Sequence, residues 1–124
     1  MKKTDLINPA LSEVIASLGH TDTLVIADAG LPIPQHTRRI DLALVRGVPT
    51  LLDTLRVVLS EMHVERAIVS EEVVTFSPHI YAALKKELGQ VPIDAVPHQA
   101  FKKHTASARA AVRTGEFTPY ANVI

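Results

Sequence analysis

The chain of 124 residues lacks cysteine, an excess of charge of either sign, and any long hydrophobic run. The absence of cysteine excludes disulfides, thiolate metal sites and cysteine nucleophiles. Lys and Arg together number 13, as do Asp and Glu, so the formal net charge is +0. A neutral chain has no long-range field to attract phosphate backbones or anionic lipids, and no stretch approaches the ~18 apolar residues of a membrane span. We therefore expect neither nucleic acid nor membrane as a partner.

Several sequence motifs of common enzymes are also missing. The five glycines form neither a dinucleotide fingerprint nor a phosphate loop, and no nucleophile-elbow serine is present. The six histidines include no pair one helical turn apart that could share a metal ion. These gaps argue against a dehydrogenase, a kinase, a serine hydrolase and a metalloenzyme. We expect chemistry that needs no metal or other cofactor.

The residues that are present predict one α/β domain over residues 1–124. Hydrophobic residues make up 47% of the chain, enough for a core, and the N-terminus lacks the apolar run of a signal peptide, which makes the cytoplasm the expected location. The pattern predicts helices over 9–18, 51–62, 78–88 and 98–105, strands over 24–27, 40–45, 66–69, 91–96 and 110–113, and an extended segment over 120–124.

The signals at the ends of these elements are specific. Asn8 can cap the first helix, Gly19 suits a left-handed stop after it, and Ser77 and Gly89 bound the helix over 78–88. The strand over 24–27 is wholly apolar, as in a strand buried on both faces. The alternation predicts a layered α/β/α-type domain with a central, mostly parallel sheet.

Two candidate functional residues flank the first strand. Asp28 ends the strand and enters a proline-rich loop, where its carboxylate could accept hydrogen bonds from two hydroxyls of one sugar. Alternatively, it bonds its own turn. His20 precedes the strand and could give and take a proton near pH 7, or could instead bind the carbonyls that end the first helix.

Three further polar residues lie near predicted element ends. His98 follows Pro97 at the start of a short helix, and Tyr120 and Asn122 lie on the extended segment near the C-terminus. Read alone, His98 is a helix-terminal or surface histidine, and the other two are ordinary residues of an edge strand. With no tryptophan in the chain, a sugar site would depend on hydrogen bonds rather than on broad stacking.

Four segments make the sequence more specific than these patterns. They are LGHTD at 18–22, DAGLPIP at 28–34, RID at 39–41 and RTGEFTPYAN at 113–122. Together they closely resemble the D-ribose pyranase family, and the related fucose mutarotases share the broader pattern. The resemblance covers nearly the whole chain, although residues 73–90 agree only in pattern.

The resemblance implies a cofactor-free isomerase that converts β-D-ribopyranose into the β-D-ribofuranose that a ribokinase phosphorylates. It also implies that His20 is the acid, that Asp28 and His98 bind the sugar, and that Tyr120 and Asn122 complete the site. The family assembles into rings, typically a decamer of two stacked pentamers. Alternatives are a mutarotase for another sugar such as fucose, a sugar-binding accessory of ribose uptake without catalysis, and a purely structural ring protein.

The spacing of His20 and Asp28 adds a geometric constraint. An extended chain between them spans about 26 Å at ~3.3 Å per residue, and the intervening turn shortens this only in part. Because a strand separates the two residues, one sugar within one subunit cannot reach both. The sequence therefore predicts a site shared between subunits, with His20 reaching into a neighbour's pocket.

Overall fold

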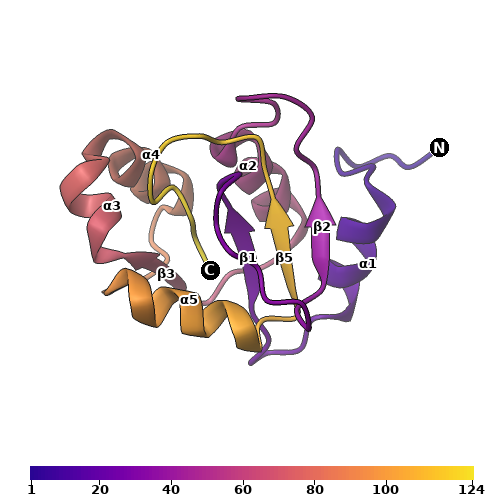
Figure 1. The fold of residues 1–124 in the computed structure, drawn as a ribbon. Helices are drawn as coiled ribbons and strands as arrows, with labels where there is room; N and C mark the ends of the chain where they lie inside the picture. Colours follow the sequence, from indigo (N-terminus) through magenta and orange to yellow (C-terminus); the bar gives the residue numbers. More distant parts are fainter.

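A computed structural model describes residues 1–124. The chain forms five helices and five strands (Figure 1). In chain order these are α1 (Pro9–Ser17), β1 (Leu24–Ala27), β2 (Arg39–Asp41), α2 (Leu51–Glu61), β3 (Ala67–Ser70), α3 (Glu71–Phe76), α4 (Pro78–Leu88), β4 (Ile93–Val96), α5 (His98–Ser107) and β5 (Ala110–Arg113).

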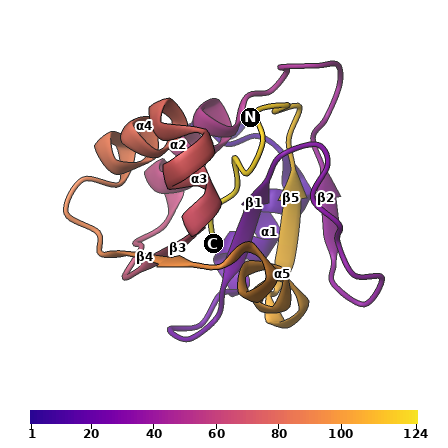
Figure 2. The ribbon, with the colours of Figure 1, turned by 60° about the vertical axis from the view of Figure 1, so that its left-hand side comes forward.

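The strands form two parallel sheets. The first has the order β1-β5-β2, and the second pairs β3 with β4 (Figure 2). The α/β class and the parallel strands are confirmed, but the strands divide into two small sheets instead of one. The last two residues connect the sheets through backbone hydrogen bonds, because Val123 pairs with Ile26 of β1 and Ile124 pairs with Ile68 of β3.

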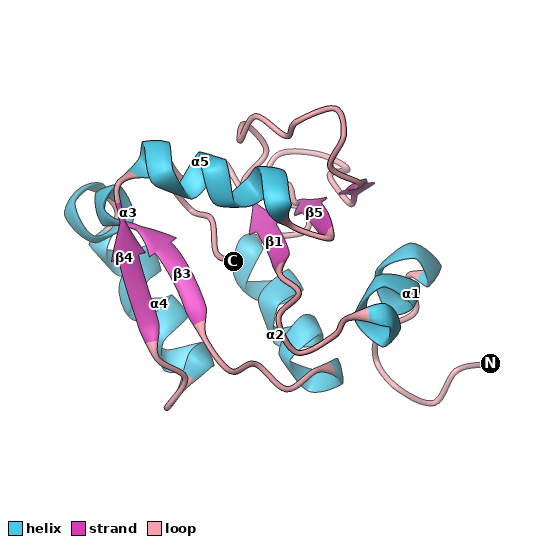
Figure 3. Cartoon of the chain, turned by 90° about the horizontal axis from the view of Figure 1, so that it is seen from below, coloured by secondary structure: helices cyan, strands magenta, loops and turns pink.

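Strand β1 is buried on both faces, as its apolar sequence predicts. Leu24 and Ile26 belong to the main core with side chains of α1, α2 and α4, whereas Val25 and Ala27 pack with Phe101 of α5. In Figure 3, α5 lies along one side of the two sheets, and α2 and α4 lie on the other. The sheets are thus the middle layer of the molecule.

The helix boundaries follow from local chemistry. The Asn8 side chain accepts a hydrogen bond from the Leu11 amide at the start of α1, as predicted, and Thr50 caps α2 in the same way. Gly89 ends α4 with a φ of +61°, also as predicted. The expected left-handed stop at Gly19 is wrong, since α1 ends at Ser17, the capping residue Leu18 is extended, and Gly19 has no positive φ.

Other expectations also need correction. The predicted strand over 40–45 is confined to β2, and the following loop exposes Leu44 and Val45. Helix α3 was not predicted, and Ser77 makes no side-chain cap for α4. The segment over 120–124 contains a single bridging residue, Val123, instead of a strand. No helix has the length and apolar character needed to cross a membrane.

Candidate functional site

The carboxyl ends of both sheets border one cavity of about 430 Å³, here called the Asp28 pocket. Its lining residues are Asp28, Ala29, Gly30, Leu31, Pro32, His98, Arg113, Glu116, Phe117, Pro119 and Tyr120. Asp28 follows β1, Arg113 ends β5, and His98 lies two residues beyond β4. Parallel strands commonly present ligand-binding residues at this edge.

The backbone and one amide side chain hold the Asp28 carboxylate in place. One oxygen accepts a hydrogen bond from the Gly30 amide at 3.0 Å, and the other accepts one from Nδ2 of Asn122 at 3.2 Å. Burial raises the pKa of Asp28 above its ordinary value, although the hydrogen bonds from Gly30 and Asn122 oppose the rise. The turn interpretation of Asp28 is thus correct as geometry, and the same carboxylate borders the cavity.

Asn122 lies behind Asp28 and is only 1% exposed. Its Oδ1 accepts a hydrogen bond from the Asp28 backbone amide at 2.7 Å, in addition to the Nδ2 contact. Asn122 therefore fixes both the main chain and the side chain of Asp28. It is not itself among the residues that line the pocket.

His98 is held mainly by aromatic packing. Its ring meets the Tyr120 ring edge-on at a centroid distance of 5.1 Å and stacks on Phe101 at 6.3 Å. Its Nδ1 is buried and has no hydrogen-bond partner. Since no hydrogen bond from a neighbouring side chain fixes the ring, its position depends on packing and on the backbone at the start of α5.

Tyr120 has a left-handed backbone conformation, with a φ of +61°, which is uncommon for a residue other than glycine. The segment around it is held by Ser77, whose hydroxyl donates to the Pro119 carbonyl at 2.9 Å. Phe76 stacks on the Tyr120 ring at 5.7 Å. Such strained residues cluster at functional sites, and this one forms part of the pocket wall.

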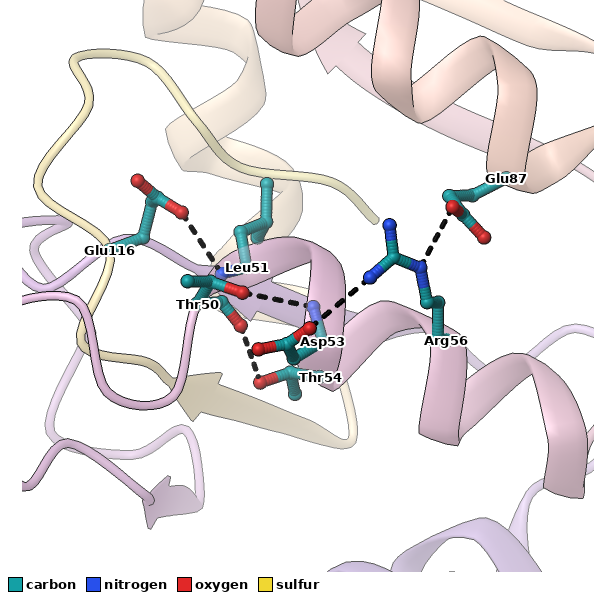
Figure 4. A network of polar contacts seen from close by, with 7 residues as sticks. All are labelled: Thr50, Leu51, Asp53, Thr54, Arg56, Glu87 and Glu116. Carbon is teal, nitrogen blue, oxygen red and sulfur yellow. Dashed lines mark hydrogen bonds and ion pairs between the residues drawn. The ribbon is translucent and has the colours of Figure 1, made fainter.

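Two charged residues of the wall are engaged in structural contacts. Arg113 donates to the Ala29 carbonyl at 3.0 Å and to both oxygens of Asp41 at 3.2 Å. Glu116 accepts a hydrogen bond from the Leu51 amide at 3.1 Å, which caps the start of α2 (Figure 4), and one from the Thr118 hydroxyl at 2.9 Å. Both residues therefore shape the pocket while tying it to the fold.

His20 lies elsewhere, at the amino end of β1. It borders a second cavity of about 560 Å³, here called the His20 groove, whose lining is mostly apolar and includes Ile15, Leu18, Leu55 and Val123. The His20 side chain is 97% exposed, and its one polar contact joins Nδ1 to Glu65 at 3.4 Å. It makes no hydrogen bond to a helix carbonyl, so that alternative interpretation is wrong.

The turn that carries His20 is nevertheless fixed. The Asp22 carboxylate accepts a hydrogen bond from the Gly19 amide at 2.8 Å and pairs with Arg109 at 3.1 Å. Two hydrogen bonds lower the pKa of Asp22: the Gly19 amide has the larger effect, and the Arg109 side chain has the smaller one. The structure thus presents an exposed imidazole on a defined turn.

The structure brings together four of the five predicted site residues. Asp28, His98 and Tyr120 line one pocket, Asn122 supports it from behind, and His20 lies at the other end of β1. Sequence reasoning assigned no role to Arg113 or Glu116. Arg113 could have been found from topology, because it ends a predicted strand whose partner in a parallel sheet ends just before Asp28.

These groups suit proton transfer and hydrogen bonding to a hydroxyl-rich ligand. The pocket offers a carboxylate, an imidazole, a phenol and a guanidinium, which can accept from or donate to several hydroxyls. The structure contains no group of three or more His, Cys, Asp or Glu side chains arranged to hold a metal ion.

The RbsD / FucU transport protein family model matches residues 1–124. The chain belongs to this family. Among curated relatives in the RbsD / FucU family, the D-ribose pyranase of Coprothermobacter proteolyticus is 60% identical and that of Chloroflexus aggregans is 59% identical. Each match covers 100% of this chain and 95% of the relative.

Solved structures of RbsD / FucU proteins share this architecture. Bacillus subtilis RbsD complexed with D-ribose matches with a TM-score of 0.96 and 43% identity, covering 99% of this chain and 94% of that one. The fucose mutarotase from Streptococcus pneumoniae, in complex with L-fucose, matches with a TM-score of 0.83 at 24% identity, covering 99% and 94%. The second likeness concerns the fold alone.

Proposed function

We infer that this chain is a D-ribose pyranase, an isomerase that interconverts β-D-ribopyranose and β-D-ribofuranose. The observation that carries this conclusion is the match, at a TM-score of 0.96 over 99% of the chain, to a family member in complex with D-ribose. Curated D-ribose pyranases at 60% and 59% identity over the whole chain support the same reaction. The fucose mutarotase is more distant in sequence.

The reaction breaks one carbon–oxygen bond and forms another, and the help it requires from the protein is proton transfer. A proton is added to the ring oxygen while another leaves the anomeric hydroxyl, so the bond from the anomeric carbon to the ring oxygen breaks and a free aldehyde forms. The hydroxyl on C4 then adds to the aldehyde carbon and loses its proton, while the aldehyde oxygen gains one. The furanose ring results with no net change in atoms or electrons. Acid–base assistance of this kind is worth about 10²–10⁴ in rate.

The pocket residues are suited to hold the sugar during these steps. The Asp28 carboxylate can accept hydrogen bonds from two sugar hydroxyls, and His98 and Tyr120 border the same cavity. Asn122 keeps Asp28 in position through two hydrogen bonds. His20 supplies the acid that protonates the leaving oxygen. A site that bonds several hydroxyls rejects sugars that lack them.

The proposal includes a site shared between two copies of the chain. His20 lies at the amino end of β1 and the Asp28 pocket at the carboxyl end, and the four residues of β1 span about 13 Å at ~3.3 Å per residue. The exposed His20 on its fixed turn is suited to enter a neighbour's Asp28 pocket. We extend the proposal to a ring assembly, a decamer of two pentamers, located in the cytoplasm. Analytical ultracentrifugation should then give the mass of ten 13.5-kDa chains.

Mixing two inactive variants tests the shared site. When His20→Ala and Asp28→Ala chains assemble together, some contacts join a normal His20 to a normal Asp28 pocket. We expect each variant alone to be inactive and the co-assembled mixture to regain part of the activity. A mixture as inactive as either parent would rule out the shared site.

Saturation-transfer NMR on free sugars tests the function itself. Irradiating the pyranose signal of D-ribose should reduce the furanose signal faster when the protein is present, because the protein speeds the exchange of ring forms. L-fucose serves as the comparison sugar. Faster exchange for L-fucose alone would indicate a mutarotase, and binding of ribose without faster exchange would indicate a non-catalytic sugar-binding protein.

A further inference from the structure

Helix α3 contacts Tyr120 of the Asp28 pocket and the backbone of His98, another residue of its wall. Phe76, its last residue, stacks on Tyr120, and Glu72, in its first turn, contacts the start of α5. One oxygen of Glu72 accepts a hydrogen bond from the backbone amide of His98 at 2.8 Å. This contact joins two segments that are distant in sequence.

The parallel pairing of β3 and β4 explains how these residues meet. In this sheet Ser70 lies opposite Val96, and both residues end their strands. Glu72 lies two residues beyond Ser70, and His98 lies two residues beyond Val96. The register therefore brings the Glu72 carboxylate to the first residue of α5.

The start of α5 needs such an acceptor. The first amides of a helix have no partner within the helix, and the residue that precedes α5 is Pro97, which has no side-chain group to cap them. Glu72 supplies the missing acceptor from another helix. Its negative charge also lies at the helix end that favours an anion.

The placement of His98 depends on this backbone contact. The buried Nδ1 of its ring has no hydrogen-bond partner, so only packing against Tyr120 and Phe101 holds the imidazole in the pocket wall. The hydrogen bond to Glu72 fixes the backbone of His98, and with it the point from which the side chain extends toward the pocket. We propose that Glu72 is a positioning residue that sets His98 in the sugar pocket by capping α5.

The test uses three variants of α3, and its activity arm rests on the proposed function. Glu72→Ala removes the acceptor, Glu72→Gln keeps an oxygen that can accept the same hydrogen bond, and Glu71→Ala is the matched control. The Glu71 side chain is exposed and makes no hydrogen bond or ion pair. We expect Glu72→Ala to weaken D-ribose binding and slow ring exchange by about tenfold, the effect of 1.4 kcal/mol. Glu72→Gln should retain most of both, and Glu71→Ala should resemble the unaltered chain.

A double-mutant cycle separates positioning from general loss of structure. If Glu72 acts through His98, then adding Glu72→Ala to a His98→Ala chain should cause little further loss of ribose affinity. An equal loss in both backgrounds would overturn the proposal. So would a Glu72→Gln chain as defective as Glu72→Ala, or a Glu72→Ala chain with normal affinity and exchange.

A sugar-free measurement keeps this test independent of the enzyme activity. Amide hydrogen exchange by NMR should show the His98 amide protected in the unaltered, Glu71→Ala and Glu72→Gln chains and rapidly exchanging in Glu72→Ala. If the chain did not speed the exchange of ribose ring forms, the proposed function would be wrong. The hydrogen-exchange measurement would still show whether Glu72 holds the His98 amide. An unchanged His98 amide in Glu72→Ala would overturn the contact.

Discussion

The two ends of β1 differ in almost every property that matters for a site. At the carboxyl end, the Asp28 pocket gathers polar side chains from the ends of β1 and β5 and from the start of α5, and its carboxylate is partly buried and hydrogen-bonded. At the amino end, the His20 groove is largely apolar, and its histidine is 97% exposed. The first region is suited to hold a ligand, whereas the second presents one imidazole, that of His20, beside an apolar surface. This difference is the basis of the proposed site that combines the two ends of β1 from different copies of the chain.

The largest expected effect comes from removing His20. In the His20→Ala chain, the rate of catalysed ring exchange should fall by a factor of about 10²–10⁴, the usual contribution of a general acid. Its thermal stability should stay the same, because the ring is 97% exposed and its one polar contact within the chain is with Glu65. Saturation-transfer NMR and calorimetry measure the two properties. His79→Ala, which removes another exposed histidine, should change neither property. Full activity in His20→Ala would contradict a catalytic role for the amino end of β1.

A smaller effect should come from crowding the loop that supports the pocket. A Cβ at Gly115 would lie 2.6 Å from the backbone oxygens of Val45 and Val48, so the loop must shift. We expect Gly115→Ala to lower the free energy of unfolding by about 1–3 kcal/mol, as overpacking does. Gly30→Ala is the matched control, because its Cβ would come no closer than 3.8 Å to Asp28. Equal stability of the two variants by chemical denaturation would contradict this account of the loop.

The smallest expected effect is a change in the titration of Asp28. Since burial raises its pKa, the carboxyl should titrate above the ordinary value of 3.8 when followed by carbon-13 NMR. Asn122→Ala should raise this pKa further, because the Asn122 hydrogen bond favours the charged form.

The sign of the pH effect on stability follows from the same shift. Between the unfolded and folded pKa values, the folded chain binds more protons at Asp28, so this residue makes the protein less stable as pH rises through that window. The Asp22 pKa is lowered instead, and its contribution to stability is lost as pH falls. An Asp28 pKa below 3.8 would show that hydrogen bonding outweighs burial.

Much of the fold could be predicted because its elements have strong local signals. The apolar run of β1 and the periodic faces of α2 and α4 needed no tertiary information. Helix α3 has only six residues and begins with Glu71 and Glu72, so it has too few turns for a periodic pattern. The run over 40–45 is apolar except for Asp41, yet Leu44 is 77% exposed in a loop, and sequence pattern alone does not distinguish that loop from a strand.

The candidate site was predictable where residues follow strands and hidden where contacts are tertiary. Asp28 and His98 follow predicted strands, and the segment with Tyr120 and Asn122 was found by resemblance to a family. The contact of Glu72 with α5 depends on the β3–β4 register, which no local signal specifies. The separation of His20 from Asp28 was expected from the strand between them, and the shared site stays a prediction.

The order of strands in the first sheet has a consequence for how the molecule is made. Its central strand, β5, comes after the other two in the chain, and it is the only strand that pairs with β1 or β2. During synthesis, β1 and β2 therefore have no strand to pair with until β5 has left the ribosome. Because contacts between distant segments slow folding, the sheet closes late. The same event delivers Arg113 and the loop after it, so the first sheet and this wall of the Asp28 pocket form together.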